Sequence, residues 1–227
     1  MLGDTGRKRA EDLKTALVYI LPQVNAARVY EPLARRFVES YVRNPPGVEV
    51  HGLTIISNGG PIQERQKRLF HPLPCYWMEH SNLGKDVGAF QMAAEKIECD
   101  LLICFGSHIH FVRAGWLDRI VNVFLDNGPA LYGAWGFHQP ADHIRTTAFW
   151  MPPEILRSYP IWVGNAQRYQ FEHSPTDSIT AFTRRCGFPT LQVTWDGVYD
   201  LPQWKHVTRE ETLFLEQHTA GLGWNAR

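Results

Sequence analysis

Four short apolar runs along the chain predict buried strands. Thr15–Leu21 (TALVYIL) and Leu101–Phe105 are uninterrupted runs of strand length, and Val48–Ile56 and Cys75–Met78 are also β-rich. We expect these four segments to form the interior of one sheet.

Three further segments predict helices. Apolar residues recur at helical spacing from Tyr30 to Tyr41, from about Asp86 to Ile97 and from Leu117 to Phe124. Strands and helices therefore alternate, which predicts an α/β, Rossmann-like fold with a mostly parallel sheet flanked by helices. Ligands bind such sheets at the carboxyl ends of the strands, so the functional site is expected there.

The second half of the chain has a less regular pattern. Ala130–Phe137 and Leu191–Trp195 predict strands. Between them, Ser174-Pro175-Thr176-Asp177 predicts the start of a helix that ends near Gly187. Ser174 would be its cap, Pro175 suits the first helical position, and Asp177 complements the positive end. We expect an irregular C-terminal half within the same domain.

Composition and charge narrow the class of protein. The chain has 227 residues with 23 basic and 23 acidic side chains, so its formal net charge is zero. A protein with no net charge has no long-range electrostatic attraction for polyanions, which argues against nucleic acid as the main partner. No run approaches the ~20 apolar residues of a membrane span, and the start is polar, so we expect a cytoplasmic protein with no membrane span.

The same features predict the domain boundaries. Residues 1–13 are expected to form a charged leader and residues 14–207 a single domain. Residues 208–227 are expected to form a C-terminal helix or tail that packs on this domain.

Two glycine-containing segments follow predicted strands. Ser57-Asn58-Gly59-Gly60 closes the second strand, and small turn-forming residues let a ligand approach the backbone. Asn82-Leu83-Gly84-Lys85-Asp86-Val87-Gly88-Ala89 stands at a strand-to-helix junction. Its glycines, cation and carboxylate can bind ribose hydroxyls, a base edge or phosphate. The alternative is that Asp86 only caps the helix.

Two histidines follow the strand Leu101–Phe105. On an extended chain His108 and His110 point to the same side, where two imidazoles could hold one metal ion or face one diphosphate. The alternative is a polar strand end whose histidines face solvent. The other histidines are too scattered in sequence to define a zinc site.

Taken in order, these segments resemble a known family. Their order resembles that of the GT-A glycosyltransferase fold, of the family 2 and rhamnan-synthesis-like kind. The segments that carry the resemblance are the first strand and helix, SNGG, NLGKDVGA, DLLICFGSHIHF, GWLDRI and a late Glu172. The resemblance spans about Thr15 to His206. It implies a single GT-A-like domain that moves a sugar from a nucleotide-sugar donor to a hydroxyl acceptor, such as a glycan, in glycan or polysaccharide assembly. A hexosyltransferase is the implied type.

The resemblance also implies roles for particular residues. It implies nine donor-binding residues at four places in the chain. They are Pro22 and Gln23 after the first strand, Asn58 at the end of the second strand, Asn82, Gly84, Lys85 and Asp86 at the start of the following helix, and Ser107 and His108 after Phe105. The segment His143–Phe149 is similar to a histidine-containing stretch on the acceptor side, with His143, Arg145, Thr146 and Thr147. Glu172 falls where the catalytic base is expected, and Asp177 is the reserve base.

One departure from the family concerns the metal. The acidic D-x-D pair that holds the cation in most such enzymes should stand where this chain has Ser107-His108-Ile109-His110. The family implies Mn²⁺ or Mg²⁺, and His108 and His110 are the available ligands, since imidazole can serve Mn²⁺. Without the D-x-D pair, metal-independent transfer is the alternative.

Two interpretations compete with an active transferase. One is a non-catalytic nucleotide- or sugar-binding domain that retains the fold and has lost the metal motif. The other is a histidine-based metallohydrolase, which predicts bound zinc.

Overall fold

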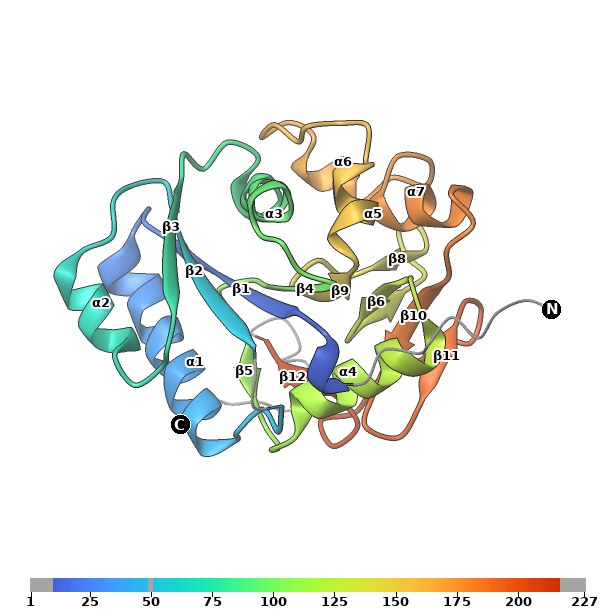
Figure 1. Ribbon diagram of the computed structural model, residues 1–227. Helices are drawn as coiled ribbons and strands as arrows, with labels where there is room; N and C mark the ends of the chain where they lie inside the picture. Colours follow the sequence, from blue (N-terminus) through green and yellow to red (C-terminus); the bar gives the residue numbers. More distant parts are fainter. Residues whose placement is uncertain (1–9, 49–50, 217–227) are drawn as a thin grey trace.

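In the computed structural model, which describes residues 10–48 and 51–216, eight strands form one sheet in the order β11-β10-β6-β9-β4-β1-β2-β3 (Figure 1). Strands β1, β2, β3 and β4 are mutually parallel, and β6 is parallel to β10, whereas β9 and β11 run antiparallel to their neighbours. The bounds are β1 Thr15–Pro22, β2 Gly52–Asn58, β3 Tyr76–His80, β4 Leu101–Phe105, β6 Leu131–Gly133, β9 Ala148–Met151, β10 Thr190–Val193 and β11 Val198–Asp200.

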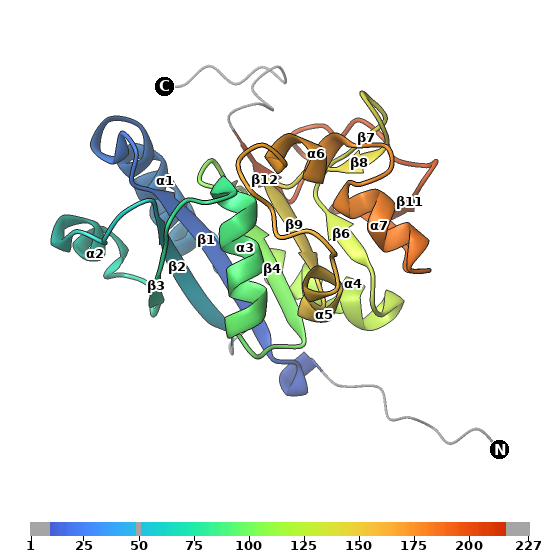
Figure 2. The same cartoon turned by 90° about the horizontal axis from the view of Figure 1, so that it is seen from above.

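Helices cover both faces of this sheet, as Figures 1 and 2 show from two directions. One face carries α1 (Glu31–Arg43), α2 (Glu64–Phe70) and α4 (Trp116–Asn127). The other face carries α3 (Lys85–Lys96), α5 (Pro153–Arg157), α6 (Arg168–His173) and α7 (Ile179–Arg185). The short elements are η1 (Ala10–Asp12), η2 (Ala26–Tyr30), and the strand pairs β5 (His110–Phe111) with β12 (Phe214–Leu215) and β7 (Gly136–Phe137) with β8 (His143–Ile144).

Strand β1 shows why the central strands read as unbroken apolar runs. Successive side chains point to opposite faces, and both faces are covered. Leu17, Tyr19 and Leu21 belong to the core that contains Phe37 of α1. Ala16, Val18 and Ile20 belong to the second core, which contains α3 side chains. Neither face of β1 is left for polar residues.

The predicted fold class is confirmed. The structure is α/β, with a mostly parallel sheet flanked by helices, and the first-half elements start or end within a few residues of their predicted bounds. The predicted strand Ala130–Phe137 divides into β6 and β7. Strand β9 was not predicted, and it lies antiparallel between β4 and β6.

The prediction that Ser174 caps a helix is wrong. Helix α7 begins at Ile179, and Ser178 is its cap, with the hydroxyl accepting a hydrogen bond from the Ala181 amide at 3.1 Å. Ser174 instead follows the end of α6, where its hydroxyl accepts from the Asp177 amide at 2.9 Å. A serine hydroxyl can satisfy a turn as well as a helix start, so the local pattern did not distinguish them.

We expect Ser178→Ala to lower the free energy of unfolding by about 1 kcal/mol, the usual effect of removing a helix cap. Ser178 is fully buried, and its hydroxyl is the partner that the Ala181 amide would lose. Urea denaturation of Ser178→Ala and of the control Ser174→Ala measures the difference. A larger loss for Ser174→Ala would contradict the assignment of the cap.

Residues 208–227 were expected to form a helix or a tail that packs on the domain, and their described part is a tail without a helix, whose Leu213 and Phe214 are buried in the core. Residues 208–216 form a turn and β12, which pairs antiparallel with β5, and residues 217–227 lie outside the described residues. The pairing delivers Glu216 to the region of the sheet's carboxyl edge. The unpaired edge of β5 favours a strand here, and a local sequence pattern cannot indicate this pairing because β5 is distant in sequence.

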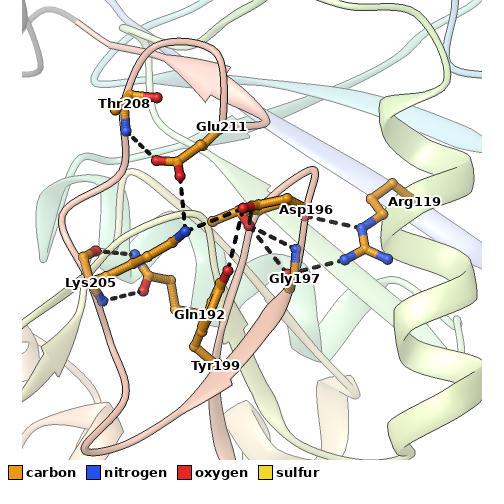
Figure 3. A network of polar contacts seen from close by, with 9 residues as sticks. Arg119, Gln192, Asp196, Gly197, Tyr199, Lys205, Thr208 and Glu211 are labelled. Carbon is orange, nitrogen blue, oxygen red and sulfur yellow. Dashed lines mark hydrogen bonds and ion pairs between the residues drawn. The ribbon is translucent and has the colours of Figure 1, made fainter.

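A polar network holds the segment that leads to β12 (Figure 3). The Lys205 ammonium lies 3.3 Å from a carboxylate oxygen of Asp196 and 2.9 Å from one of Glu211. The Lys205 backbone exchanges two hydrogen bonds of 2.8 Å with the Gln192 side chain on β10. Arg119 of α4 donates to the carbonyls of Thr194 and Gly197, both at 3.0 Å. The segment that leads to β12 is therefore tied to β10 and to the turn at residues 194–197, and α4 holds that turn.

No helix within the described ranges is long and apolar enough to cross a membrane.

Candidate active site

A cavity of about 470 Å³ opens at the carboxyl ends of β1, β2 and β4. From β1 the chain adds β2 and β3 on one side and then β4 on the other, so the order of the strands reverses between β1 and β4. Open α/β sheets bind ligands at such a reversal. The lining residues are Ile20, Pro22, Val24, Tyr30, Asn58, Asn82, Lys85, Asp86, Gly106, Ser107, His108, Arg145, Thr147, Arg168, Glu172 and Glu216.

The ends of β1 and β2 supply one wall. Pro22, Asn58 and Asn82, which were expected to bind the donor, line the cavity, and the buried Asn58 has its Oδ1 2.8 Å from His80 Nδ1. Gln23 does not line the cavity. Its side chain carbonyl accepts a hydrogen bond from Gln66 of α2 at 3.1 Å, so it is directed toward that helix.

The start of α3 supplies the next wall. Gly84 precedes this helix with φ +73°, and a Cβ there would lie 1.9 Å from the Val163 carbonyl oxygen. Only glycine fits this position. Its amide donates to Asn165 Oδ1 at 2.9 Å. Gly84 thus fixes the helix start against the 163–165 loop, while the residues after it, Lys85 and Asp86, line the cavity.

Asp86 does not cap α3, contrary to the alternative drawn from the sequence. Its two carboxylate oxygens accept from Nε and Nη2 of Arg168, at 2.5 Å and 3.0 Å, in a bidentate pair. The planar guanidinium matches a carboxylate in this geometry, which fixes the relative position of α3 and α6.

Glu172 lies inside α6 and is buried, whereas the sequence placed it before a helix. Its Oε2 accepts from Thr146 Oγ1 at 2.6 Å and from Arg168 Nη1 at 3.0 Å. Burial acts to raise the pKa of Glu172, but Arg168 and the Thr146 hydrogen bond outweigh burial and hold that pKa below its usual value. Glu172 is therefore an ionised carboxylate at neutral pH.

Arg168 is stabilised in turn by the two carboxylates. Burial acts to lower the pKa of Arg168, and Asp86 and Glu172 raise it above its usual value. Its Nη2 also donates to Thr146 Oγ1 at 3.0 Å. Asp86, Arg168, Glu172 and Thr146 thus form one network on the cavity wall.

A further part of the lining comes from the segment before β9 and from the residue that follows β12. Arg145 Nε lies 2.6 Å from Glu216 Oε1 and donates to Thr147 Oγ1 at 3.1 Å. Of the four residues expected on the acceptor side, Arg145 and Thr147 line the cavity, whereas Thr146 and His143 are buried and do not line it.

The two histidines after β4 do not meet on one side. Residues 107–109 turn, with the Ile109 amide donating to the Gly106 carbonyl, so the alternation of an extended strand does not apply there. Ser107 and His108 line the cavity, but His110 lies buried in β5. Burial lowers the pKa of His110 to about 4.

The cation that the family implies does not fit this strand end. Ser107, His108 and His110 offer no carboxylate, and His110 is directed away from the cavity lining. Mg²⁺ in particular requires oxygen ligands. We therefore derive no step through a metal held at this position.

Arg168 and Glu216 are charged lining residues that the sequence did not indicate, and Asp177, like Gln23 and His110, lies outside the cavity lining. Arg168 stands four residues before Glu172, a spacing that pairs charges on a helix, but the sequence did not predict helix α6 there. Glu216 gave no local signal. Asp177 is exposed on the turn after α6, where its carboxylate accepts from the Thr176 hydroxyl at 2.8 Å, and it does not line the cavity.

Comparisons with known proteins show similarity of structure only. No family model matches the chain, and no curated protein matches it by sequence. HddC from Yersinia pseudotuberculosis is similar over 66% of this chain and 81% of its own, with a TM-score of 0.45 and 12% identity. Mouse xyloside xylosyltransferase 1 in its apo form is similar over 75% and 80%, with a TM-score of 0.49 and 13% identity.

A mannosyltransferase from Pyrobaculum calidifontis, solved in complex with GDP-Man and Mn²⁺, is similar over 69% of this chain and 49% of its own, with a TM-score of 0.47 and 9% identity. Similarity at this level carries no argument about the activity of this chain. Membership of a rhamnan-synthesis-like family stays a prediction.

Proposed function

We propose that this protein is a glycosyltransferase of the hexosyltransferase type that moves a sugar from a nucleotide-sugar to a hydroxyl of a glycan or similar acceptor. The observation that carries this proposal is the cavity at the strand-order reversal, where the ends of β1, β2 and β4 and the first turn of α3 meet. Its volume of about 470 Å³ suits a ligand of nucleotide-sugar size.

The donor would lie along the β1, β2 and α3 walls. Asn58 and Asn82 offer amides for a base edge or ribose, and Lys85 at the first turn of α3 offers a cation for the diphosphate. Charge develops on the leaving diphosphate during transfer, so cations fixed in advance lower the barrier. His108 and Arg145, which also line the cavity, are placed to assist.

The acceptor would enter between Arg145 and Glu172. A general base must reach the acceptor hydroxyl, and Glu172 is the proposed base because it is an ionised carboxylate that lines the cavity. Arg168 and Thr146 hold its Oε2, which leaves Oε1 for the substrate.

One observation favours a second candidate, a nucleotide- or sugar-binding domain without turnover. Each of the acidic side chains that line the cavity, Asp86, Glu172 and Glu216, is paired with an arginine. Such pairs hold a binding site rigid but make each carboxylate a weaker base.

A ligand screen tests the donor half of the proposal. We expect one of the UDP-, GDP-, dTDP- or CMP-sugars to raise the melting temperature, because a ligand that binds only the folded state stabilises it. Lys85→Gln should then weaken the affinity for that donor about tenfold, through loss of a charge-assisted contact.

Lys96→Gln is the matched control, since Lys96 is the last residue of the same helix and does not line the cavity. Equal losses for the two variants, or no donor that binds, would contradict the proposed donor site. Transfer to a panel of glycan acceptors then separates the transferase from the binding domain, which would bind donor and neither transfer nor hydrolyse its sugar.

A further inference from the structure

A cluster of metal-ligating side chains includes Glu172 and two histidines. The ligand atoms of His143, Glu172 and His173 all lie within 4.8 Å of one another. His143 comes from β8, and the other two are the last residues of α6. These two elements pack together, although their residues are about 30 positions apart in sequence.

The hydrogen bonds of these residues leave ligand atoms available. His143 Nδ1 lies 2.8 Å from the Ala141 carbonyl, so this nitrogen carries the proton and Nε2 keeps its lone pair. A backbone carbonyl on the far nitrogen is the usual support of a metal-binding histidine. Glu172 uses Oε2 for Thr146 and Arg168, while Oε1 lies 3.9 Å from His173 Nε2.

The second imidazole is also available for a ligand. Within the described residues, His173 Nδ1 is buried and makes no hydrogen bond.

Both imidazole rings pack against aromatic neighbours. The His143 ring stacks on Phe137 with centroids 5.6 Å apart, and His173 packs against Tyr169 with centroids 4.5 Å apart. The two imidazoles themselves meet edge to face at 4.4 Å.

The local charge favours a cation. Asp86 and Glu172 carry two negative charges and Arg168 one positive charge, so their network has a net charge of −1 beside the two imidazoles. Arg145, the next cation, is already paired with Glu216. A divalent ion would therefore enter a site that is negative before it binds.

We infer that His143, Glu172 and His173 form a binding site for a divalent transition-metal ion, with Zn²⁺ as its best fit. Two imidazoles and one carboxylate are a ligand set of catalytic zinc sites, in which a fourth position holds water or substrate. Mg²⁺ and Ca²⁺ require more oxygen ligands. Bonds of about 2.0–2.1 Å in a tetrahedron place ligand atoms about 3.3 Å apart. The cluster must contract to bind, and the partly exposed His173 side chain can rotate to do so.

Glu172, one of the three ligands, lines the cavity and is the proposed base, so a metal held here would lie next to the side proposed for the acceptor. Zinc lowers the pKa of a bound water or hydroxyl, so an acceptor hydroxyl on the fourth position would lose its proton to solvent or a nearby carboxylate more readily. This role rests on the proposed function, whereas the binding of the metal does not.

Metal binding by the full chain, without any nucleotide-sugar, tests the inference. The protein is stripped with a chelator, dialysed against Zn²⁺, and assayed for metal content and by calorimetric titration. We expect one Zn²⁺ per chain, with excess Mg²⁺ or Ca²⁺ unable to displace it. Co²⁺ in place of Zn²⁺ should give the visible absorption of a four-coordinate site.

Two variants remove one ligand each. In His143→Asn the amide can still donate to the Ala141 carbonyl, and His173→Gln changes a side chain that is not fully buried. Each should weaken Zn²⁺ affinity by about tenfold or more and lose the cobalt absorption. The matched control is His138→Gln, which alters an exposed histidine paired with Asp142 at 2.8 Å outside the cluster.

The outcomes are separable from those of the donor experiment. Two results would overturn the metal site and leave the proposed transferase standing. One is that the stripped wild type does not bind Zn²⁺, and the other is that His143→Asn and His173→Gln bind Zn²⁺ as tightly as His138→Gln does. If one of the two variants unfolds after the metal is removed, the other variant is used alone, because the cobalt spectrum of either variant tests the site. Zn²⁺ binding with no donor binding would retain the metal site and overturn the proposed function.

Discussion

Arg168→Met should lower the free energy of unfolding by about 3 kcal/mol, because removing one partner of a buried ion pair leaves the other charge uncompensated. Arg168 donates to Asp86, Glu172 and Thr146. The Glu172 side chain is only 7% exposed, so water cannot replace the lost guanidinium. Methionine keeps the aliphatic part of the packing. Urea denaturation followed by circular dichroism measures the change.

The matched control is Arg65→Met. Arg65 also pairs with a glutamate, Glu31 at 2.8 Å, but its side chain is 49% exposed. An exposed pair contributes about 1 kcal/mol or less. The double variant Arg168→Met with Glu172→Gln should recover part of the loss, since it leaves no unpaired carboxylate at position 172. A loss for Arg168→Met no greater than that for Arg65→Met would contradict the role we give to the network.

Glu172→Gln should reduce sugar transfer by about 10²-fold or more while donor affinity stays within a small factor of the wild type. A group that acts on the acceptor proton stabilises the transition state and contributes little to donor binding. Glutamine is nearly isosteric, and its carbonyl can still accept from Thr146 and Arg168. Transfer rates and donor titrations on the same preparations provide the two readouts.

Asp177→Asn is the control for this experiment. Asp177 was the reserve base, but it is exposed on a turn and does not line the cavity, so we expect this variant to transfer sugar at the wild-type rate. A wild-type rate for Glu172→Gln together with a loss for Asp177→Asn would reverse the two roles. If chelation stops wild-type transfer and Zn²⁺ restores it, Glu172 acts as a metal ligand; otherwise it acts on the acceptor directly.

Local patterns predicted the parts of the site that lie next to strands. Asn58 closes β2, and Lys85 and Asp86 open α3, so a strand end or a helix start was enough to place them. The carboxyl ends of parallel strands share one edge, which is why these residues converge in the cavity. The same reasoning failed for His110, because a turn after β4 ended the alternation on which it depended.

The partners of these residues could not be predicted from local patterns. Arg168 pairs with Asp86 across 82 positions, and Glu216 reaches Arg145 only because β12 pairs with β5. His143 and His173 are likewise scattered in sequence and adjacent in the fold. Contacts of this kind depend on how whole elements dock, and no periodicity of 2 or 3.6 residues encodes them.

The sequence by itself determined strands β1 to β4 and β10, helices α1, α3 and α4, and the edge of the sheet where polar residues gather, because burial imposes a short-range pattern that can be read along the chain. Only the tertiary structure decided that Asp86 is an anchor for Arg168 instead of a cap, that Glu172 is buried and ionised, and that two histidines stand beside it. The charge and burial of a side chain depend on the neighbours that packing brings to it, and those neighbours come from distant parts of the chain.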